Sequence, residues 1–409
     1  MSALRENGTQ AQDPAPLETS QGSALTVATR RDWMKSCGAT TLCSLAGLTL
    51  DSRAALPQSS GAQAAGAVGV PLRARLSLNE NAFGCSPRVV EAISNSLGNL
   101  SRYTEREAEV LTAQIAAKEG VKPEQVLLGE VLAALGTQLS VAGGPGGEFI
   151  YSTPGFTDLV AAAEQTGGTA VGIPLNGRLE NDLPALAART NSRTRAVYLV
   201  NPHNPSGTVS DGVTFKSFVR DLSRRMLVIV DEAYLEFTGS FAERTLAPLV
   251  KAEHPIVMFR TFDKAYGLAA LQFGYALAPT ALANTLRQRG IGASHGLNRL
   301  AVVAAAAALS DTHFIDETQR KIAAERARWN SALDELRVRR SDSQGNFVFF
   351  ESGRRYDEVA AAFLAEGVQI ARSFPPLDRW IRISIGLPEE NTLAIGMLRR
   401  LLGRVGASS

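Results

Sequence analysis

The fold is decided by two stretches of sequence, AVYLVNPHNPSG at residues 196–207 and LVIVDEAY at residues 227–234. In each stretch a run of apolar residues continues without polar alternation and then ends in polar and turn-forming residues. A continuous apolar run of this length predicts a strand buried on both faces, as in a parallel sheet covered by helices. The polar residues that follow then lie at the carboxyl edge of the sheet, where open α/β folds bind ligands.

Similar apolar runs recur along the chain, and stretches with helical spacing separate them. The expected strands of the first part are residues 126–128, 149–151, 170–173, 196–200, 227–230, 256–259 and 273–277. Alternation of strands and helices is typical of an α/β protein with a mostly parallel sheet and helices on both of its faces.

The pattern changes toward the C-terminus. Apolar residues at helical spacing over residues 315–336 predict one long amphipathic helix. Strands are expected after it at residues 346–351, 368–371 and 380–385, around a single helix. We therefore expect a large domain at residues 98–312 and a smaller α+β domain at residues 313–409, with residues 65–97 packed against the small domain.

The first seventy residues differ in composition from the rest. The sequence TRRDWMK at residues 29–35 is followed by a mildly apolar run at residues 36–50 and by Ala62-Gln63-Ala64. This order resembles a twin-arginine (Tat) export signal with a small-residue cleavage site. We therefore expect residues 1–64 to be a Tat signal and flexible N-terminus, read by the Tat translocon, and the protein to be exported or periplasmic. A tail with a chance arginine pair is the alternative.

Composition excludes several classes of protein. The chain has 409 residues, with 42 Lys and Arg against 40 Asp and Glu, and 45% of its residues are hydrophobic. These values exclude wholesale disorder and a nucleic-acid binder that relies on bulk positive charge. No run reaches 18 uninterrupted apolar residues, which excludes a protein with many membrane spans. Only Cys85 lies beyond the signal, so no internal disulfide is expected and a small buried apolar role is the simplest for it.

Three charged residues lie inside or directly after apolar strands, where burying a charge costs free energy. Asp231 and Lys264 each follow an apolar strand, and Arg382 lies inside the apolar sequence WIRIS at residues 380–384. An arginine in such a strand requires an anion from the protein or from a ligand. Simpler interpretations stay open at this point, because Asp231 is also a good helix N-cap and Lys264 is also compatible with a solvated surface.

Four motifs in this order resemble those of the fold-type-I pyridoxal-phosphate (PLP) aminotransferases, nearest to the histidinol-phosphate aminotransferase branch. The motifs are NPHNPSG at 201–207, DEAY at 231–234, DKAYGLA at 263–269 and WIRIS at 380–384. Shorter matches are LNEN at 78–81, RY at 102–103, TPGF at 153–156 and NFVFF at 346–350. The resemblance runs from about Leu76 to the C-terminus.

The resemblance implies PLP as cofactor, no metal, and a specific set of cofactor contacts. Lys264 is expected to form the Schiff base and to move the proton at the substrate α-carbon, because PLP acts as an electron sink held on a lysine. The other expected cofactor contacts are Asp231 at the pyridine nitrogen, Asn204 and Tyr234 at the ring hydroxyl, Phe156 on the ring face, and Tyr103 at the phosphate of a neighbouring subunit. The last contact implies a homodimer.

The resemblance also implies the reaction. Arg382 is expected to hold the substrate α-carboxylate, Arg372 to bind a distal phosphate, and Asn79 to lie at the substrate. The expected activity moves an amino group from an L-amino acid or related amine to a 2-oxo acid. The alternatives are a PLP-dependent lyase, decarboxylase or oxidase on the same scaffold, or an inactive homologue that binds a ligand.

The expected site for the cofactor phosphate departs from the family pattern. A small-residue turn is replaced by Glu130-Val131-Leu132, a serine by Asp263, and an arginine by Gln272. The family turn precedes a helix N-terminus that cradles the phosphate. Three explanations are open: weaker PLP binding, compensation by another cation with Arg260 the nearest in sequence, or a different PLP reaction or none.

Overall fold

The structure is a computed structural model that describes residues 70–403, so the predicted signal at residues 1–64 lies outside the described residues. The described part begins just before the first strand and ends with the last helix. Within it, no helix is both long and apolar enough to cross a membrane.

A seven-stranded sheet forms the centre of the larger part, with strand order β2-β8-β7-β6-β5-β3-β4. Six strands run parallel, and β8 runs antiparallel to both of its neighbours. The strands are β2 Val126–Leu128, β3 Glu148–Thr153, β4 Thr169–Pro174, β5 Thr194–Val200, β6 Leu227–Asp231, β7 Ile256–Thr261 and β8 Gly274–Leu277. The predicted mostly parallel α/β sheet is therefore confirmed.

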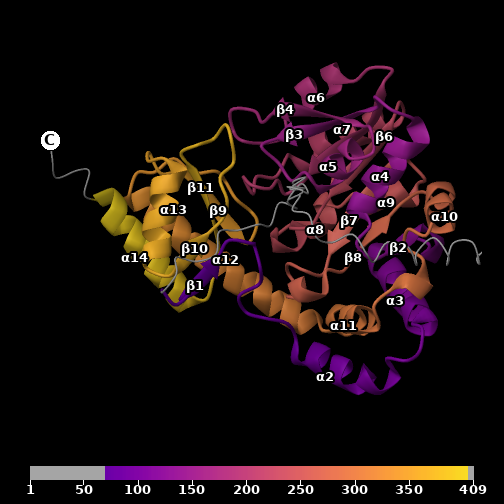
Figure 1. Ribbon diagram of the computed structural model, residues 1–409, viewed down its shortest axis with the longest axis horizontal. Helices are drawn as coiled ribbons and strands as arrows, with labels where there is room; N and C mark the ends of the chain where they lie inside the picture. The colour runs from indigo at the N-terminus through magenta and orange to yellow at the C-terminus, as the bar shows by residue number, and fades with distance from the viewer. Residues whose placement is uncertain (1–69, 404–409) are drawn as a thin grey trace, which may run out of the picture. The chain divides into compact units, whose positions relative to one another are not determined.

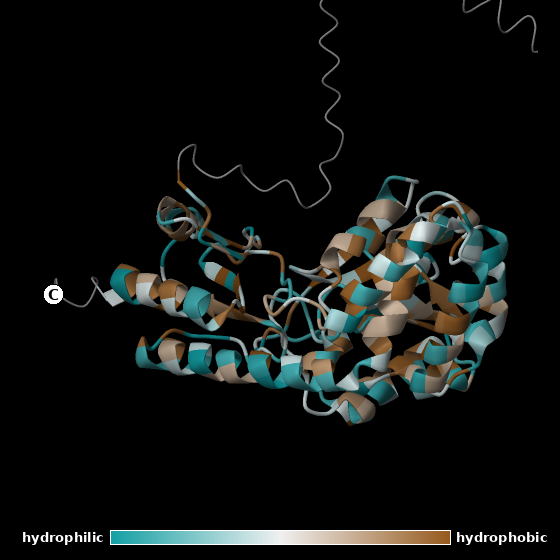
Figure 2. Ribbon diagram, turned by 90° about the horizontal axis from the view of Figure 1, so that it is seen from below, coloured by the Kyte–Doolittle hydropathy of each residue, from teal (hydrophilic) through white to brown (hydrophobic). Residues whose placement is uncertain are grey.

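Both faces of this sheet are buried, which explains the continuous apolar runs. Along β5, Val197 and Leu199 belong to one buried cluster, and Ala196, Tyr198 and Val200 belong to the other. Because successive side chains of a strand point to opposite faces, each apolar residue fills one of the two cores. The hydropathy colouring shows the same arrangement, with apolar strands inside and polar residues on the outer turns of the helices (Figure 2).

Helices cover the sheet and lie between most successive strands of the chain, except β7 and β8, which are joined through a short 3₁₀ turn (Figure 1). The α-helices of this part are α2 Pro87–Ser96, α3 Glu105–Glu119, α4 Leu132–Gly143, α5 Asp158–Glu164, α6 Leu183–Arg189, α7 Gly212–Ser223, α8 Phe241–Arg244, α9 Ala247–Lys251, α10 Thr280–Gln288 and α11 Arg299–Ser310. Short 3₁₀ turns are η1 Leu97–Asn99, η2 Pro123–Gln125, η3 Leu235–Phe237, η4 Ala269–Leu271 and η5 Ser294–Gly296.

The C-terminal part contains two small sheets and three helices. The predicted long helix is α12 Thr312–Glu335, and it is followed by α13 Tyr356–Ala365 and α14 Pro388–Gly403. The strands are β9 Phe347–Glu351 paired antiparallel with β11 Trp380–Ser384, and β1 Ala74–Leu76 paired parallel with β10 Val368–Ile370. Figure 1 shows β1 beside β10, so the start of the described chain joins its C-terminal part.

The segment after β1 connects the C-terminal part to the loop that follows β7. Asn346 Nδ2 donates to the backbone oxygen of Asn79 at 2.9 Å, and Asn81 Nδ2 donates to that of Ala265 at 3.0 Å. Gly267 has a φ of +74°, and a Cβ on it would lie 2.1 Å from the backbone oxygen of Gly84. Only glycine allows this approach, so the DKAYGLA loop is held against the start of the chain.

Candidate active site

The predicted site residues come from the carboxyl ends of four parallel strands. Phe156 follows β3, Asn204 follows β5, Asp231 is the last residue of β6, and Lys264 follows β7. Because parallel strands end at the same edge of a sheet, one face of the fold gathers all four residues. Phe156 is half-buried and packs on the cluster that contains Tyr198.

Asp231 is a buried carboxylate with two hydrogen-bond donors. Its side chain is in a residue only 6% exposed, and it accepts from the Tyr198 hydroxyl at 3.2 Å and from the Ala233 amide at 2.9 Å. Burial raises the pKa of Asp231 to about 6, because the charged form loses its water. The Ala233 contact alone is what a local cap would give. A carboxylate this deeply buried also needs a cationic or N–H partner, which indicates a binding site.

Tyr198 is a site residue that sequence reasoning missed. Its hydroxyl reaches Asp231 from the neighbouring strand, and burial beside that carboxylate raises the pKa of Tyr198 well above its usual value. The only sequence signal was a polar hydroxyl within an otherwise aliphatic run at 196–200. A buried tyrosine hydroxyl requires a partner, and that requirement could have suggested the contact.

Tyr234 connects two asparagines from distant parts of the chain. Its hydroxyl accepts from Asn79 Nδ2 at 3.1 Å and lies 3.4 Å from Asn204 Nδ2. Its ring packs edge-on against Phe347 with centroids 5.2 Å apart. Ser384 completes the group, because its hydroxyl accepts from the backbone N–H of Asn79 at 2.8 Å. The structure therefore brings the predicted residues Asn79, Asn204 and Tyr234 together.

Arg382 is a buried cation whose partners in the protein are uncharged. The residue is 7% exposed, Nη1 donates to Asn204 Oδ1 at 2.5 Å, and Nη2 donates to the Ser77 backbone oxygen at 2.8 Å. Its Nε has no acceptor, and burial lowers the pKa of Arg382 to about 10. Within residues 70–403 no carboxylate forms an ion pair with it. A buried cation in this state is prepared to receive an anion.

Arg372 lies near Arg382 and shares an aromatic neighbour with it. The guanidinium of Arg372 is 4.7 Å from the centroid of the Phe374 ring, and that of Arg382 is 5.1 Å from the same ring. Arg372 is more exposed, and its Nη1 donates to the Ser373 backbone oxygen at 3.0 Å. Two guanidinium groups around one ring bring positive charge together, and the negative charge of Asp158 also acts on Arg372.

Lys264 is half-buried and faces several carboxyl groups. Its Nζ lies 3.5 Å from the backbone oxygen of Leu78, which is a long contact for a charged donor. Its positive charge acts on the carboxyls of Asp231, Asp263 and Glu130. The ammonium group therefore acts on the carboxyl groups of the site.

Tyr103 is not brought to the other site residues within this chain. It is 78% exposed, and its backbone oxygen accepts from Arg299 Nη2 at 2.6 Å. Residues at the expected phosphate end do converge on one segment. The Gly129 amide donates to the Gly274 backbone oxygen at 2.9 Å, and Asp263 Oδ1 accepts from the Phe273 amide at 3.2 Å.

Arg260 does not supply the missing cation, which corrects one explanation offered above. Its side chain is fully buried and lies 2.8 Å from Glu232, 3.3 Å from Glu236 and 3.6 Å from Glu119. Its guanidinium also packs on the Phe241 ring at 4.1 Å. Three carboxylates already neutralise this arginine, so its charge is not free to bind the cofactor phosphate.

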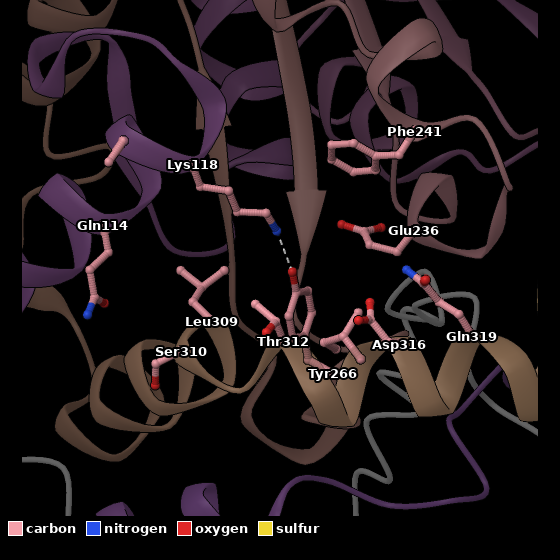
Figure 3. A pocket seen from close by; sticks show the side chains of 12 residues that line it. Gln114, Lys118, Glu236, Phe241, Tyr266, Leu309, Ser310, Thr312, Asp316 and Gln319 are labelled. Atoms are coloured by element: carbon pink, nitrogen blue, oxygen red, sulfur yellow. Dashed lines mark hydrogen bonds between the residues drawn. The ribbon is translucent and has the colours of Figure 1, made fainter.

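A separate pocket of about 520 Å³ lies beside the loop that carries Lys264 (Figure 3). Lys118 points into it and donates to the Tyr266 hydroxyl at 2.5 Å. Glu236 lies across from Lys118, and the Phe241 ring is 5.8 Å from the Lys118 Nζ. Because Tyr266 lies two residues beyond Lys264, these contacts help to fix the lysine loop.

The ring end of the site has the donor set that a pyridoxal ring needs. A buried carboxylate, a lysine amine, an asparagine amide and a tyrosine hydroxyl stand at one sheet edge, and a buried arginine lacks an anion. The phosphate end has a helix N-terminus but also two carboxyl groups, from Glu130 and Asp263. The residues present fit the cofactor ring and the substrate carboxylate. The phosphate end does not fit as well, because its side chains are acidic rather than basic.

Comparison with known proteins assigns most of the chain to one family of enzymes. Residues 74–396 match the family model described as aminotransferase class I and II. The histidinol-phosphate aminotransferase of Limosilactobacillus fermentum is 36% identical over 327 residues, covering 78% of this chain and 88% of that one. The aromatic amino acid aminotransferase of Cutibacterium acnes is 33% identical over 325 residues, covering 79% and 91%.

Solved structures agree with the sequence relatives. The crystal structure of histidinol-phosphate aminotransferase from Sinorhizobium meliloti, in complex with pyridoxal-5′-phosphate, superposes with a TM-score of 0.74. It is 28% identical in sequence and covers 82% of this chain and 92% of that chain.

Proposed function

Because the chain belongs to the aminotransferase class I and II family and is a PLP-dependent aminotransferase, we propose that it acts on an amine-bearing substrate with an anionic group at Arg382. The observation that carries this proposal is the burial of Arg382 without a carboxylate partner among residues 70–403. Leaving a guanidinium unpaired in a protein interior is costly. An α-carboxylate from an L-amino acid donor or a 2-oxo acid acceptor removes that cost.

We propose that Lys264 carries the cofactor and moves the proton at the substrate α-carbon. PLP supplies an electron sink when bound. The Lys264 amine is placed by the loop that Asn81 and Gly84 hold. Asp231 holds positive charge at the ring nitrogen, and Tyr198 and Ala233 orient its carboxylate for that purpose.

The remaining ring contacts follow from the same arrangement. Tyr234 and Asn204 present a hydroxyl and an amide to the ring hydroxyl, and Asn79 fixes the orientation of Tyr234. Phe156 covers one face of the ring. Asn204 Oδ1 also accepts a hydrogen bond from Arg382 Nη1. One asparagine therefore contacts both the cofactor side and the carboxylate side of the site.

Arg372 supports a second anionic group on the substrate. It shares the Phe374 ring with Arg382, and its partial exposure leaves room for a distal phosphate or carboxylate. The relatives include enzymes named for histidinol phosphate and for aromatic amino acids. Measuring the first half-reaction with histidinol phosphate, an aromatic amino acid and an acidic amino acid distinguishes these classes. A donor preference for uncharged side chains would contradict the role of Arg372.

A homodimer would bring Tyr103 to a second active site. The segment from α2 to α3, which contains Tyr103, carries four exposed apolar side chains: Val90, Leu97, Leu100 and Val110. Exposed apolar side chains are typical of interaction surfaces, and identical chains commonly meet through a two-fold axis. Analytical ultracentrifugation tests this proposal. A monomer that keeps full cofactor affinity would contradict it.

Export through the Tat pathway is proposed from the sequence alone. Arg30 and Arg31 precede the apolar run, and the small-residue site ends at Ala64. Twin-arginine signals carry folded proteins, which suits an enzyme that receives its cofactor in the cytoplasm. Replacing both arginines by lysine should retain the precursor in the cytoplasm. Unchanged delivery to the periplasm would contradict the proposal.

A further inference from the structure

Strand β11 carries two buried polar side chains, those of Arg382 and Ser384. The two residues are separated by one position, so their side chains leave the strand on the same face. Arg382 reaches the Tyr234 hydroxyl through Asn204. Ser384 reaches the same hydroxyl through Asn79. Two hydrogen-bonded paths therefore run from one strand to one tyrosine.

The path through Asn204 has a fixed direction. Arg382 Nη1 donates to Asn204 Oδ1 at 2.5 Å, and a guanidinium can only donate. The amide oxygen of Asn204 therefore faces the arginine, and its Nδ2 lies 3.4 Å from the Tyr234 hydroxyl. From this side the tyrosine oxygen meets a donor.

The path through Asn79 takes its direction from Ser384. The backbone N–H of Asn79 donates to Ser384 Oγ at 2.8 Å, and the Ser384 hydroxyl donates back to Asn79 Oδ1 at 3.1 Å. Ser384 is only 3% exposed, so its proton needs an acceptor in the protein, and the amide oxygen of Asn79 supplies one. Asn79 Nδ2 is thereby turned to the Tyr234 hydroxyl, to which it donates at 3.1 Å.

The backbone of Asn79 depends on the same serine. Its φ is +54°, in the left-handed region that asparagine enters more readily than most residues. The backbone oxygen of Asn79 accepts from Asn346 Nδ2 at 2.9 Å, and its N–H is held by Ser384. Removing the serine hydroxyl therefore releases both the backbone N–H and the side-chain oxygen of Asn79.

The Tyr234 hydroxyl is left with one hydrogen-bond direction. Its oxygen faces amide donors from Asn79 and Asn204, so its own proton points to a third group. Tyr234 is only 4% exposed, which leaves little access for bulk water. In the proposed function, the ring hydroxyl of PLP is the group that lies at this tyrosine.

We propose that Ser384 is a positioning residue for the reaction, which holds the Asn79 amide so that Tyr234 directs its proton to the ring hydroxyl of PLP. Without the serine hydroxyl, the Asn79 amide is free to turn over and present its oxygen to Tyr234. The tyrosine proton then points to Asn79 instead of the cofactor. The inference rests on the proposed function, with PLP bound at Lys264 and its ring hydroxyl at Tyr234.

The contact from Tyr234 affects the proton of the Schiff base at Lys264. A donor at the ring oxygen stabilises the negative charge of that oxygen. The oxygen then holds the neighbouring Schiff-base proton less strongly, so the contact lowers the pKa of the Schiff base. Loss of this one hydrogen bond should raise that pKa by about one pH unit.

Absorbance of the PLP-loaded full-length protein, followed as a function of pH, measures this pKa. Ser384→Ala should raise it by about one pH unit, whereas Ser384→Thr keeps the hydroxyl and should stay close to the parent value. Ser384→Cys has nearly the shape of serine and a weaker donor, so it should show a smaller rise. The cysteine variant keeps the test decisive if the alanine variant does not fold.

Ser352→Ala is the matched control for general loosening of this part of the fold. Ser352 is also buried, lies at the other end of the β9 and β11 pair, and donates to the backbone oxygens of Arg354 and Arg379. Its replacement should leave the pKa of the Schiff base unchanged. Tyr234→Phe supplies the second control: with no hydroxyl to direct, adding Ser384→Ala should raise the pKa no further.

Three outcomes would overturn the inference. They are an unchanged pKa in Ser384→Ala and Ser384→Cys, an equal rise in Ser352→Ala, and an equal further rise when Ser384→Ala is added to Tyr234→Phe. Failure of the proposed function gives a different result, because the parent protein would then show no absorbance from a cofactor bound at Lys264 at any pH. That result would overturn the proposed function and this inference together.

Discussion

Replacing Arg382 by lysine tests the substrate site in the most detail. Arg382 donates from Nη1 and Nη2 to Asn204 and Ser77, and its guanidinium lies 5.5 Å from the Phe347 ring centroid and 5.1 Å from that of Phe374. This fixed fork suits a two-point contact with a carboxylate. Lysine keeps the charge but offers a single point.

The expected loss is that of one charge-assisted hydrogen bond. Such a bond contributes about 1.5–3 kcal/mol, so kcat/KM for amino-acid donors should fall by roughly tenfold to a hundredfold. Most of the loss should lie in KM, because the contact is made in the ground state as well as in the transition state. The acceptor half-reaction should suffer by a similar factor, since a 2-oxo acid carries the same carboxylate.

Rapid-mixing absorbance of each half-reaction measures these factors, with the cofactor spectrum before mixing as a check on folding. Arg379→Lys is the matched control, because Arg379 is exposed and lies three residues away. A loss below about threefold in Arg382→Lys, or an equal loss in the control, would refute the reasoning.

Three further predictions concern buried ionisable groups. Asp231→Asn should abolish transamination yet stabilise the cofactor-free protein above pH 6 by up to about 3 kcal/mol, because a buried acid whose pKa is raised from 3.8 to about 6 loses stability as pH rises through this range. Thermal melting should show the full gain at pH 8 and roughly half of it at pH 5, and a destabilised variant at pH 8 would contradict the prediction. Arg260→Met should lower the free energy of unfolding by about 3–5 kcal/mol in urea titrations, since it leaves three buried glutamates without their cation, whereas Arg289→Met on the surface should change little. His203 should stay neutral from pH 8 to pH 5, because burial lowers its pKa to about 3; ring proton shifts in NMR that titrate near pH 6.5 would contradict this.

The fold was largely predictable because both faces of the central sheet are buried. Strands such as 196–200 and 227–230 appear as unbroken apolar runs, and the structure extends them by only a few residues. The reversed direction of β8 was not predictable in this way. Its sequence is as apolar as that of its neighbours, and strand direction depends on the connection rather than on residue type.

The site was predictable where chemistry forces an unusual residue into an apolar setting. Asp231 and Arg382 were found because charge at a strand end or inside a strand needs a reason. Tyr198 was missed, because tyrosine is common in buried strands and the sequence does not show which group its hydroxyl contacts. The partners of Arg260 were also hidden, since Glu119, Glu232 and Glu236 lie on separate elements and meet only in three dimensions.

The central claim is that Lys264 carries the cofactor, and trapping that bond tests it most directly. Protein incubated with PLP and treated with borohydride should hold one cofactor per chain, and peptide mass mapping should place it on Lys264. Lys264→Ala should remain unlabelled and colourless, whereas Lys251→Ala, on the exposed end of α9, should be labelled like the parent. A parent protein that stays colourless with excess PLP, or a label that maps to another lysine, would contradict the account.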